Sequence, residues 1–482
     1  MPCPSSASAK DGVSPPGRTI STGSGNRPVS KAASAAFVAA VAQAPVVHPR
    51  FSSSADFAIV PVIKNPYTGK RAAKTERFPI LARAVIIAAP SSASGKTTVT
   101  LSLLAALART GLKVASAKIG PDYIDPRYHA LASGRACYNL DEWAMRPQTI
   151  STLLADLAKD SVLVVIEGVM GLFDGPEAGK GSTADLAQSL NLPVILVVNC
   201  SHQAQSVAAL VHGFATFRKG VDIAGIILNQ VSSPRHARLL TDAAEKSGIK
   251  VVGVMARSTG LQLPSRHLGL VQASEHPQIA AFIDEAGRNA ADTCDLDAIT
   301  ALARPLDPGP DRTTGLSPLG QHTAIASDEA FGFVYPHLLN SWRRAGATLS
   351  FFSPLAGEIP APEADAIFLP GGYPELHAGK IAASTGLFKA LQNTSALIYG
   401  ECGGYMVLGE ALTDKNGAVH KMAGLLPVTT SFARRKLTLG YRTLSHNSPL
   451  PWPERLKGHE FHFSTITNSK ARPLFEATDT TG

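Results

Sequence analysis

The chain has few cysteines and no long apolar run among its 482 residues. Its five cysteines (Cys3, Cys137, Cys200, Cys294 and Cys402) are scattered and include no CxxC pair. This pattern argues against a disulfide framework and against a structural zinc site, so a reducing, cytoplasmic location is expected. Every apolar run is shorter than the roughly 18 residues that a membrane-spanning helix needs, and no membrane partner is predicted.

Net charge is also missing from most of the chain. Residues 1–83 contain 11 Lys and Arg against 3 Asp and Glu, whereas the remainder contains 34 of each, so the net charge of +8 lies in the N-terminal segment. A neutral remainder argues against nucleic acid as a partner of the catalytic part. Residues 1–82 are rich in Ser, Ala, Pro and Gly and predict a disordered basic leader. A transit peptide and a start codon assigned too far upstream are the alternatives.

The rest of the sequence alternates strand-like and helix-like patterns in two blocks. Apolar runs of strand length separated by helical segments over residues 83–300 predict an α/β domain with a doubly wound, mostly parallel sheet. A Pro- and Gly-rich stretch at 301–322 predicts a linker, and a second α/β domain is expected over 323–482. The predicted strands are residues 84–89, 114–117, 162–166, 194–198, 223–228, 323–326, 349–352 and 366–369.

Ser94, Gly95, Lys96, Thr97 and Thr98 follow the first strand and open a helix that is expected to run to residue 110. This is close to the phosphate loop GxxxxGK[ST], although its first glycine is replaced by proline. Backbone N–H groups would cradle phosphates, the lysine would reach the terminal oxygens, and Thr97 would hold Mg²⁺. A nucleotide site is therefore predicted; the alternative is a Ser-rich turn before a helix.

Acidic residues follow the ends of several predicted strands. Glu167 ends the run at 162–166 and is followed by Asp174, whereas Asp122 and Asp125 follow the run at 114–117. The carboxyl ends of parallel strands meet at one edge of a sheet, where Mg²⁺ and phosphate chemistry is found. We interpret this acidic group, with Asp141, as functional rather than as loop-solubilising or helix-capping residues.

Asn229 ends the strand at 223–228. We place it among the nucleotide-binding residues, because its amide could hydrogen-bond a nucleobase at the same edge of the sheet. Capping of the next helix is the alternative interpretation.

Cys402 lies between glycines after a short apolar run, at a predicted turn from strand to helix. Such an elbow exposes a thiolate, which the following helix N-terminus would stabilise. Gly371 and Gly372 follow another strand and could form an oxyanion hole for attack on an amide carbonyl. The base is expected to be His459 or His462, which strand alternation places on opposite faces. A buried structural cysteine with surface histidines is the alternative.

Several longer motifs resemble one family. They are KIGPDYIDP (118–126), NLD (139–141), EGVMGLFDG (167–175), LPSRHLGL (263–270), FSPL (352–355), PGGYPE (370–375) and GECGGY (400–405). In this order, over residues 84 to about 476, they resemble the cobyrinate and hydrogenobyrinate a,c-diamide synthases of cobalamin biosynthesis. The stretches at 268–273 and 428–433 favour the hydrogenobyrinate branch.

The resemblance implies a P-loop domain similar to dethiobiotin synthetase, followed by a class I, triad-type glutamine amidotransferase domain. It implies a carbon–nitrogen ligase that uses ATP and Mg²⁺. The a- and c-carboxylates of hydrogenobyrinate or cobyrinate would be phosphorylated, and ammonia released from glutamine would displace the phosphate. The oligomeric state is left open, a homodimer included.

The resemblance also assigns roles to the residues that match its motifs. Residues 90–98 would bind ATP, Thr97 with Glu167 would hold Mg²⁺, and Cys402 would be the nucleophile with His462 as its base in preference to His459. The substrate carboxylate and the γ-phosphate would meet at Asp122, Tyr123 and Asp174.

The sequence departs from the family pattern in three places. Ala93 replaces a glycine that is common in the loop, no His-x-Glu follows the base, and the chain ends at Gly482, before the glycine-rich segment that usually follows, which suggests a truncation. Two rival functions remain: an amidoligase for another tetrapyrrole or polycarboxylate, and a non-enzymatic P-loop ATPase with an inactive amidotransferase-like module. Glutaminase activity that depends on Cys402 would exclude the second of these, because an inactive module would not hydrolyse glutamine.

Overall fold

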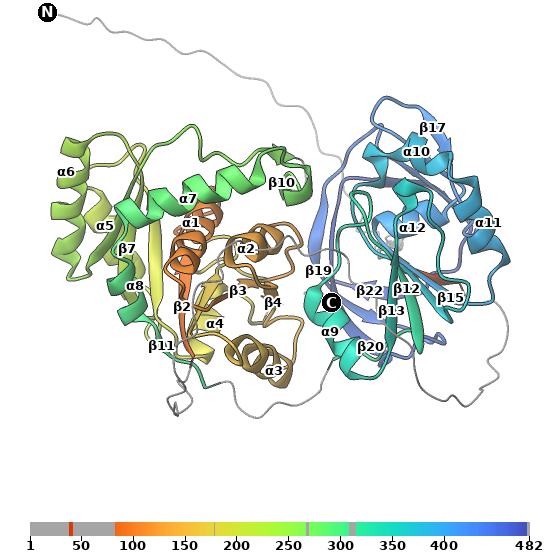
Figure 1. Ribbon diagram of the computed structural model, residues 1–482, viewed down its shortest axis with the longest axis horizontal. Coiled ribbons are helices and arrows are strands. Elements are labelled where there is room, and N and C mark those ends of the chain that lie inside the picture. The colour runs from red at the N-terminus through yellow and green to blue at the C-terminus, as the bar shows by residue number, and fades with distance from the viewer. Residues whose placement is uncertain (1–37, 42–81, 178, 267–268, 308–314, 480–482) are drawn as a thin grey trace, which may run out of the picture. The chain divides into compact units, whose positions relative to one another are not determined.

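A computed structural model describes residues 38–41, 82–177, 179–266, 269–307 and 315–479 (Figure 1). Most of the predicted leader and the middle of the predicted linker lie outside these residues. In the described part of the chain, no helix combines the length and the apolarity that crossing a bilayer requires. The remaining segments form two α/β regions, which correspond to the two blocks of the sequence.

The first region is built on a sheet with the order β4-β3-β5-β2-β6-β7-β8, in which all neighbouring strands are parallel. Each expected strand is present, with bounds within a few residues of those predicted. The strands are β2 (Arg83–Ala88), β3 (Val114–Ile119), β4 (Tyr138–Leu140), β5 (Leu163–Glu167), β6 (Val194–Asn199), β7 (Ile223–Val231) and β8 (Val251–Ala256).

Helices cover both faces of this sheet. Buried residues of α1, α2, α7 and α8 share one hydrophobic cluster, and those of α3, α4, α5 and α6 share the other. The helices are α1 (Lys96–Arg109), α2 (Asp125–Ser133), α3 (Pro147–Ala158), α4 (Thr183–Ser189), α5 (Val207–Thr216), α6 (Pro234–Ala244), α7 (Ile279–Thr293) and α8 (Leu296–Leu302); β9 (Ser265–Arg266) pairs with β10 (Gly269–Leu270).

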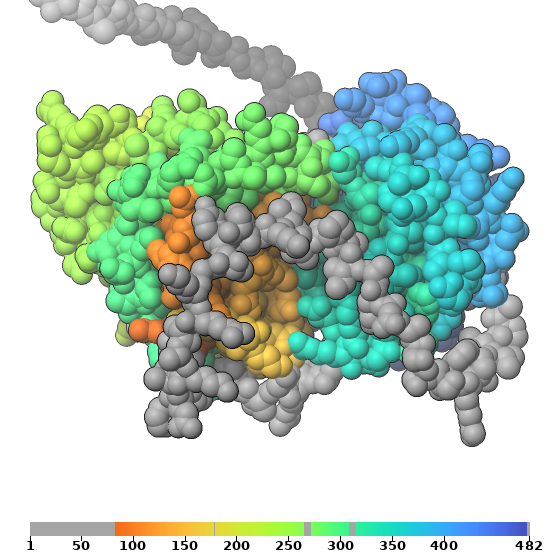
Figure 2. Space-filling view, viewed as in Figure 1, coloured from red at the N-terminus to blue at the C-terminus, as the bar shows by residue number. Residues whose placement is uncertain are grey.

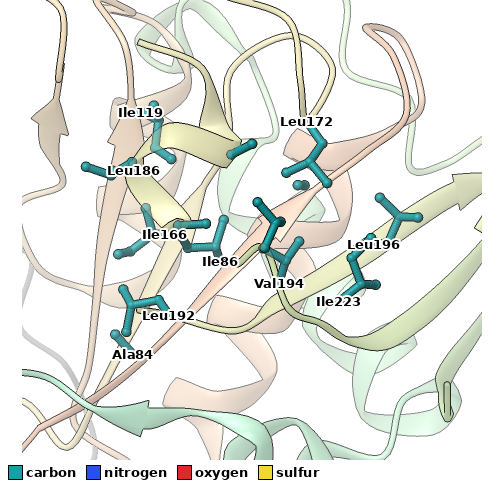
Figure 3. Close-up of a cluster of buried hydrophobic side chains, with 14 of the residues drawn as sticks. Ala84, Ile86, Ile119, Ile166, Leu172, Leu186, Leu192, Val194, Leu196 and Ile223 are labelled. Atoms are coloured by element: carbon teal, nitrogen blue, oxygen red, sulfur yellow. The ribbon is translucent and has the colours of Figure 1, made fainter. Parts of the chain in front are cut away.

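Strand β2 shows how the sequence pattern produces this two-sided core. Its successive side chains point to opposite faces, so Ile86 belongs to the cluster drawn in Figure 3. Ile87 belongs to the cluster on the other face, and both side chains are fully buried. A central strand buried on both faces needs the near-continuous apolar run that the sequence contains. Each such isoleucine contributes about 1.5–3 kcal/mol through burial.

Helix α7 packs closely on α1, and the green segment that carries it lies against the orange one in Figure 2. A Cβ added at Gly287 would lie 3.0 Å from the Cβ of Ala105, so the small residues permit this close approach. Beyond α8, β11 (Arg304–Pro305) pairs antiparallel with β2. Regular structure of the first region therefore continues past residue 300, into the stretch predicted as a linker.

The second region has a sheet with the order β1-β15-β14-β12-β13. All neighbours are parallel except β1, which pairs antiparallel with β15 and lies within the leader predicted to be disordered. These four residues correct that prediction locally, because a strand edge offers partners for their backbone N–H and C=O groups. The elements are β1 (Val38–Val41), β12 (His322–Ala326), β13 (Thr348–Phe352), β14 (Ala366–Leu369), β15 (Leu397–Glu401), α9 (Pro336–Arg344), α10 (Ala378–Ala382), α11 (Thr385–Asn393) and α12 (Gly403–Leu408).

Two smaller sheets complete the second region, with the orders β17-β16-β18-β21 and β20-β19-β22. Strand β20 carries both candidate histidines and pairs antiparallel with β19 along its whole length. The strands are β16 (Ala411–Thr413), β17 (Val419–Lys421), β18 (Val428–Ser431), β19 (Thr438–Ser445), β20 (Arg455–His462), β21 (Thr465–Ser469) and β22 (Glu476–Thr478).

Candidate active site

The phosphate loop joins β2 to α1, with Gly95 as the N-cap of the helix at φ 89°. The Asn229 side chain at the end of β7 donates a hydrogen bond of 3.0 Å to the Ser94 carbonyl. A Cβ at Gly95 would lie 2.3 Å from that Asn229 nitrogen, so only glycine fits here. Ala93 also has positive φ, at 61°, a conformation that glycine adopts at lower cost.

Asn229 is therefore part of the loop's support. The alternative that it caps the next helix is wrong, because the N-cap of α6 is Ser233, whose hydroxyl accepts from the His236 N–H. The nucleobase contact stays a prediction.

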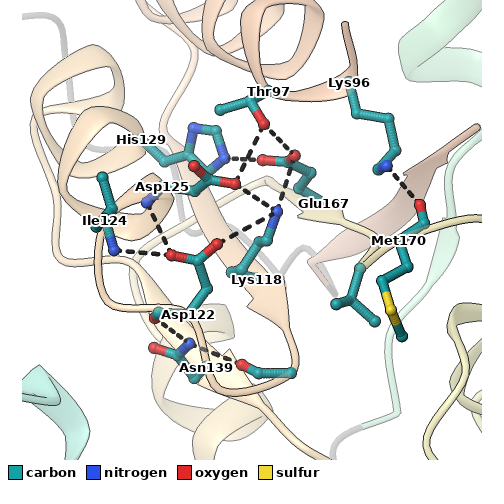
Figure 4. Close-up of polar contacts among 12 residues, drawn as sticks. Lys96, Thr97, Lys118, Asp122, Ile124, Asp125, His129, Asn139, Glu167 and Met170 are labelled. Atoms are coloured by element: carbon teal, nitrogen blue, oxygen red, sulfur yellow. Dashed lines mark hydrogen bonds and ion pairs between the residues drawn. The ribbon is translucent and has the colours of Figure 1, made fainter. Parts of the chain in front are cut away.

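Lys96 and Thr97 point from the first turn of α1 toward the carboxyl ends of the strands, with Thr98 next in the same turn. Lys96 donates to the Met170 carbonyl, and the Thr97 hydroxyl contacts both Glu167 and Asp125 (Figure 4). The hydroxyl oxygen is 2.8 Å from Glu167 Oε1 and 3.1 Å from Asp125 Oδ2, either of which can accept its proton. Burial, with Lys118 nearby, lowers the pKa of Lys96.

A buried ion cluster lies beneath the loop, with Lys118 at its centre (Figure 4). The Lys118 ammonium is 2.6 Å from Asp125, 2.9 Å from Glu167 and 4.0 Å from Asp122, and His129 contacts the other Glu167 oxygen. Burial alone would raise the pKa of Glu167, but Lys118 and His129 hold it well below its usual range. The Glu167 carboxylate is thus ionised in the interior because two cationic or donor groups compensate it.

The proposed substrate residues lie beside this cluster. Asp122 Oδ1 accepts the backbone N–H groups of Ile124 at 2.7 Å and Asp125 at 3.1 Å, while burial and the Asp125 charge raise its pKa to about 7. The exposed Asp174 accepts the Gly171 N–H at 2.9 Å and acts electrostatically on Lys96. Asp141, by contrast, caps a turn, because its Oδ1 accepts from the backbone N–H groups of Trp143 and Ala144.

The oxygen donors at the loop fit a magnesium ion. Thr97, Glu167 and Asp125 offer the hard ligands that Mg²⁺ prefers, and their side chains converge. Among the described residues, no group of three or more His, Cys, Asp and Glu side chains forms a metal site by itself. A magnesium ion here would therefore also need oxygens from nucleotide phosphates or water.

A sharp turn from β15 to α12 is present at the position predicted for the nucleophile. Cys402 has φ 45° and ψ −105° and is the N-cap of α12. The elbow is tight, because a Cβ at Gly404 would lie 1.9 Å from the Leu369 carbonyl oxygen and one at Gly372 would lie 2.1 Å from that of Ala330. Positive φ at a non-glycine residue is a strained conformation typical of functional sites.

The environment of the Cys402 sulfur corrects one expectation. Burial raises the pKa of the thiol to about 12, with the Glu375 charge acting in the same direction, although the N–H groups of Gly403 and Gly372 lower it in part. The helix N-terminus therefore does not by itself produce a thiolate, and a base is needed. The Gly372 N–H lies close enough to the sulfur to lower the thiol pKa, so it is beside the position where an oxyanion-hole donor is needed.

The two candidate histidines differ in their surroundings. His462 is buried, with Nδ1 3.1 Å from the Ser464 carbonyl and Nε2 3.7 Å from Glu460. The His459 ring lies 6.0 Å from that of Tyr123, and burial lowers its pKa to about 4. A pKa this low makes His459 the poorer proton acceptor at neutral pH.

One cavity of about 1550 Å³ reaches both groups of predicted residues. Asp122 and Tyr123 line it from the first region, and Cys402, His459 and His462 line it from the second. Ring stacking of Tyr123 on Tyr335, with centroids 4.2 Å apart, forms part of its wall. The two predicted centres, which lie far apart in the sequence, thus open into the same space.

Three residues of this site received no role from the sequence. Lys118 and His129 compensate Glu167, and Glu460 lies beside His462. The sequence did offer a signal for Lys118: a lysine near the end of a buried strand needs acidic partners, because an uncompensated cation is not tolerated there. The two-residue spacing of Glu460 and His462 on one strand face was another.

Two families of known protein domains match the two regions of the chain separately. Residues 85–271 match the CobQ/CobB/MinD/ParA nucleotide binding domain, and residues 322–482 match the CobB/CobQ-like glutamine amidotransferase domain. The chain is 53% identical over 404 residues to a hydrogenobyrinate a,c-diamide synthase of Brucella anthropi, covering 82% of this chain and 93% of the relative. It is 50% identical over 402 residues to the protein of that name in Rhizobium meliloti strain 1021, covering 83% and 94%. The chain belongs to the hydrogenobyrinate a,c-diamide synthase family.

Proposed function

We propose that the chain uses ATP, Mg²⁺ and glutamine to amidate the a- and c-carboxylates of hydrogenobyrinate in turn. The observation that carries this proposal is the single cavity that both the ion cluster's Asp122 and the nucleophile Cys402 line. Family membership supports the corrinoid substrate, since the relatives are named for that activity.

In the first region, residues 94–98 of the loop bind ATP, whose γ-phosphate is transferred to a substrate carboxylate to give an acyl phosphate and ADP. Ammonia then attacks the acyl carbon, and inorganic phosphate leaves as the amide forms. Thr97 and Glu167, with Asp125 beside them, are the residues that would hold Mg²⁺. Lys96 reaches the terminal phosphate oxygens, and Asn229 fixes the loop through Ser94. Asp122, Tyr123 and Asp174 orient the substrate carboxylate; activation is needed because a carboxylate carbon is a poor electrophile.

In the second region, Cys402 attacks the side-chain amide of glutamine. His462 takes the thiol proton, and the N–H of Gly372 stabilises the oxyanion. The products are a thioester on Cys402 and ammonia, and hydrolysis of the thioester releases glutamate. Because free ammonia is scarce at neutral pH, its local release beside the activated carboxylate gives the two-region arrangement its advantage.

Ammonia passes, in this proposal, through the cavity from Cys402 toward Asp122 and the Glu167 face. The stacked rings of Tyr123 and Tyr335 are half-buried and line the cavity, which supports a path partly shielded from bulk solvent. Shielding matters because ammonia that escapes into water is protonated and loses its nucleophilic lone pair.

The test is incubation of the purified chain with hydrogenobyrinate, glutamine, ATP and Mg²⁺. Mass spectrometry should show two successive conversions of carboxylate to amide, each accompanied by hydrolysis of ATP. A parallel incubation with cobyrinate measures the preference for a cobalt-free ring through kcat/KM. The proposal is wrong if neither corrinoid is amidated while the chain still binds ATP and hydrolyses glutamine.

A further inference from the structure

The face of β20 that carries His462 also carries a second titratable group. Glu460 and His462 alternate onto the same face and are both buried, whereas Phe461 between them is exposed. Glu460 Oε1 lies 3.7 Å from His462 Nε2. This separation is longer than a hydrogen bond, so the carboxylate acts on the imidazole through its charge.

Arg442 on the neighbouring strand β19 holds the Glu460 carboxylate in place. Its Nε donates to Glu460 Oε2 at 2.7 Å, and Nη2 lies 2.6 Å from the same oxygen. Its Nη1 donates to the Tyr441 carbonyl at 2.9 Å, which fixes the guanidinium in turn. Glu460 Oε2 is thus engaged by arginine, while Oε1 faces the imidazole.

The backbone determines which nitrogen of His462 is basic. Nδ1 lies 3.1 Å from the Ser464 carbonyl oxygen, which can only accept a hydrogen bond. Nδ1 therefore carries the proton of the neutral ring, and Nε2 carries the lone pair. That lone pair is on the nitrogen closest to Glu460, so protonation of Nε2 creates an ion pair with the carboxylate.

We propose that Glu460 is the positioning residue for His462, and that its carboxylate stabilises the imidazolium formed when Nε2 takes the proton of Cys402 Sγ. One proton moves from sulfur to nitrogen, leaving a thiolate, and no other bond changes. This inference rests on the proposed roles of Cys402 and His462. A His-x-Glu arrangement places the acid two residues after the base; here it lies two residues before it, and strand alternation makes the two positions equivalent neighbours.

The other charges around the thiol make this assistance necessary. Glu375 and Glu401 both act electrostatically on Cys402 in the direction that opposes a thiolate. Protonation of His462 would add a positive charge that opposes them, and Glu460, held by Arg442, lies where it favours this charge.

The experiment compares Glu460→Gln and Glu460→Asp with Glu476→Gln, which removes an exposed carboxylate from β22 of the same sheet. Two quantities are measured in the full chain: the kcat and KM for glutamine hydrolysis, and the rate at which iodoacetamide alkylates Cys402 between pH 6 and 9. Glu460→Gln should lower kcat by about 10²-fold, within the range of general acid–base assistance, with little change in KM. Alkylation of Cys402 should slow and begin at higher pH, Glu460→Asp should be intermediate, and Glu476→Gln should match the unmodified chain.

A merely structural role of Glu460 predicts different results. An unchanged alkylation profile in folded Glu460→Gln, or a raised KM with unchanged kcat, overturns the proposal; the second result would assign Glu460 to glutamine binding. If Glu460→Gln does not fold, Glu460→Asp is used in its place. The proposal is then overturned if Cys402 in Glu460→Asp is alkylated at the same rate as in the unmodified chain. The alkylation comparison needs neither glutamine nor corrinoid, so it tests Glu460 even if the proposed activity is not found.

Discussion

The two centres that share the cavity stabilise reactive groups by opposite means. Beneath the phosphate loop, Lys118, Asp125 and Glu167 are buried charges that compensate one another at 2.6–2.9 Å. At the elbow, Cys402 is held by strained backbone at φ 45° and by glycine packing, with little compensating charge beside it. If the proposed roles hold, the ATP site is built from charges that are in place before the ligand binds. The proposed nucleophile, which must change its charge during turnover, is left weakly compensated.

The strongest way to separate the two centres is to remove the nucleophile. Cys402→Ala should lose essentially all glutamine-dependent amidation, whereas ammonium salts should restore the product, because the first region and its acyl activation are intact. Product formation is followed by mass spectrometry with either nitrogen source. Failure of ammonium rescue in a variant that still binds ATP would contradict the proposed division of labour.

Removing the central cation tests the charge-compensated centre. Lys118→Met should lower the free energy of unfolding by about 3–5 kcal/mol, because it leaves buried carboxylates uncompensated. The matched control is Arg109→Met, which breaks the half-exposed pair with Asp284 and should cost about 0–1 kcal/mol. Urea unfolding measures both. Equal losses in the two variants would show that the buried carboxylates do not depend on Lys118 for charge compensation.

The pH dependence of stability sharpens the same comparison. The pKa of Asp122 is raised to about 7 by burial and by Asp125, so its contribution to stability is full below about pH 4 and is lost as the pH rises through 7. Asp122→Asn removes this titration, so the free energy of unfolding should fall less between pH 5 and pH 8 than it does in the unmodified chain. The expected difference is about 2 kcal/mol, because one pKa unit corresponds to about 1.4 kcal/mol and the partial exposure of Asp122 reduces the full effect. Urea unfolding at both pH values gives the difference, and an unchanged pH dependence would be the contrary result.

The smallest effect concerns backbone strain in the loop. Ala93→Gly should raise the free energy of unfolding by about 1 kcal/mol, because φ 61° is costly for alanine. Ala108→Gly in the last turns of α1 is the control, and it should lower the free energy of unfolding by about 1 kcal/mol, since glycine is unfavourable in a helix. Thermal unfolding of both variants provides the measurement, and a destabilised Ala93→Gly would contradict the strain argument.

Much of the fold followed from local pattern. The continuous apolar run of β2 and the glycine-bounded turn at Cys402 leave few alternatives for a buried strand and an elbow. The strand β1 did not follow, because its pairing with β15 depends on an edge formed by residues more than 350 positions away.

The site was predictable where chemistry is encoded by neighbours in sequence and less so where it depends on packing. Thr97 and Glu167 could be paired because the helix that follows β2 begins at the same sheet edge where β5 ends in Glu167, and their side chains are 2.8 Å apart. The support of Ser94 by Asn229, and of His462 by Glu460 and Arg442, depends on strand register and rotamers, which a single sequence does not specify.

The raised pKa of Cys402 has a consequence for the lifetime of the protein. Oxidants and electrophiles react with sulfur chiefly as the anion, and their access also depends on exposure. A sulfhydryl that stays protonated at rest is a poor target for peroxide or for adventitious disulfide exchange. The raised thiol pKa therefore predicts slower oxidation and disulfide exchange at Cys402 in the resting chain than a thiolate at the same position would show.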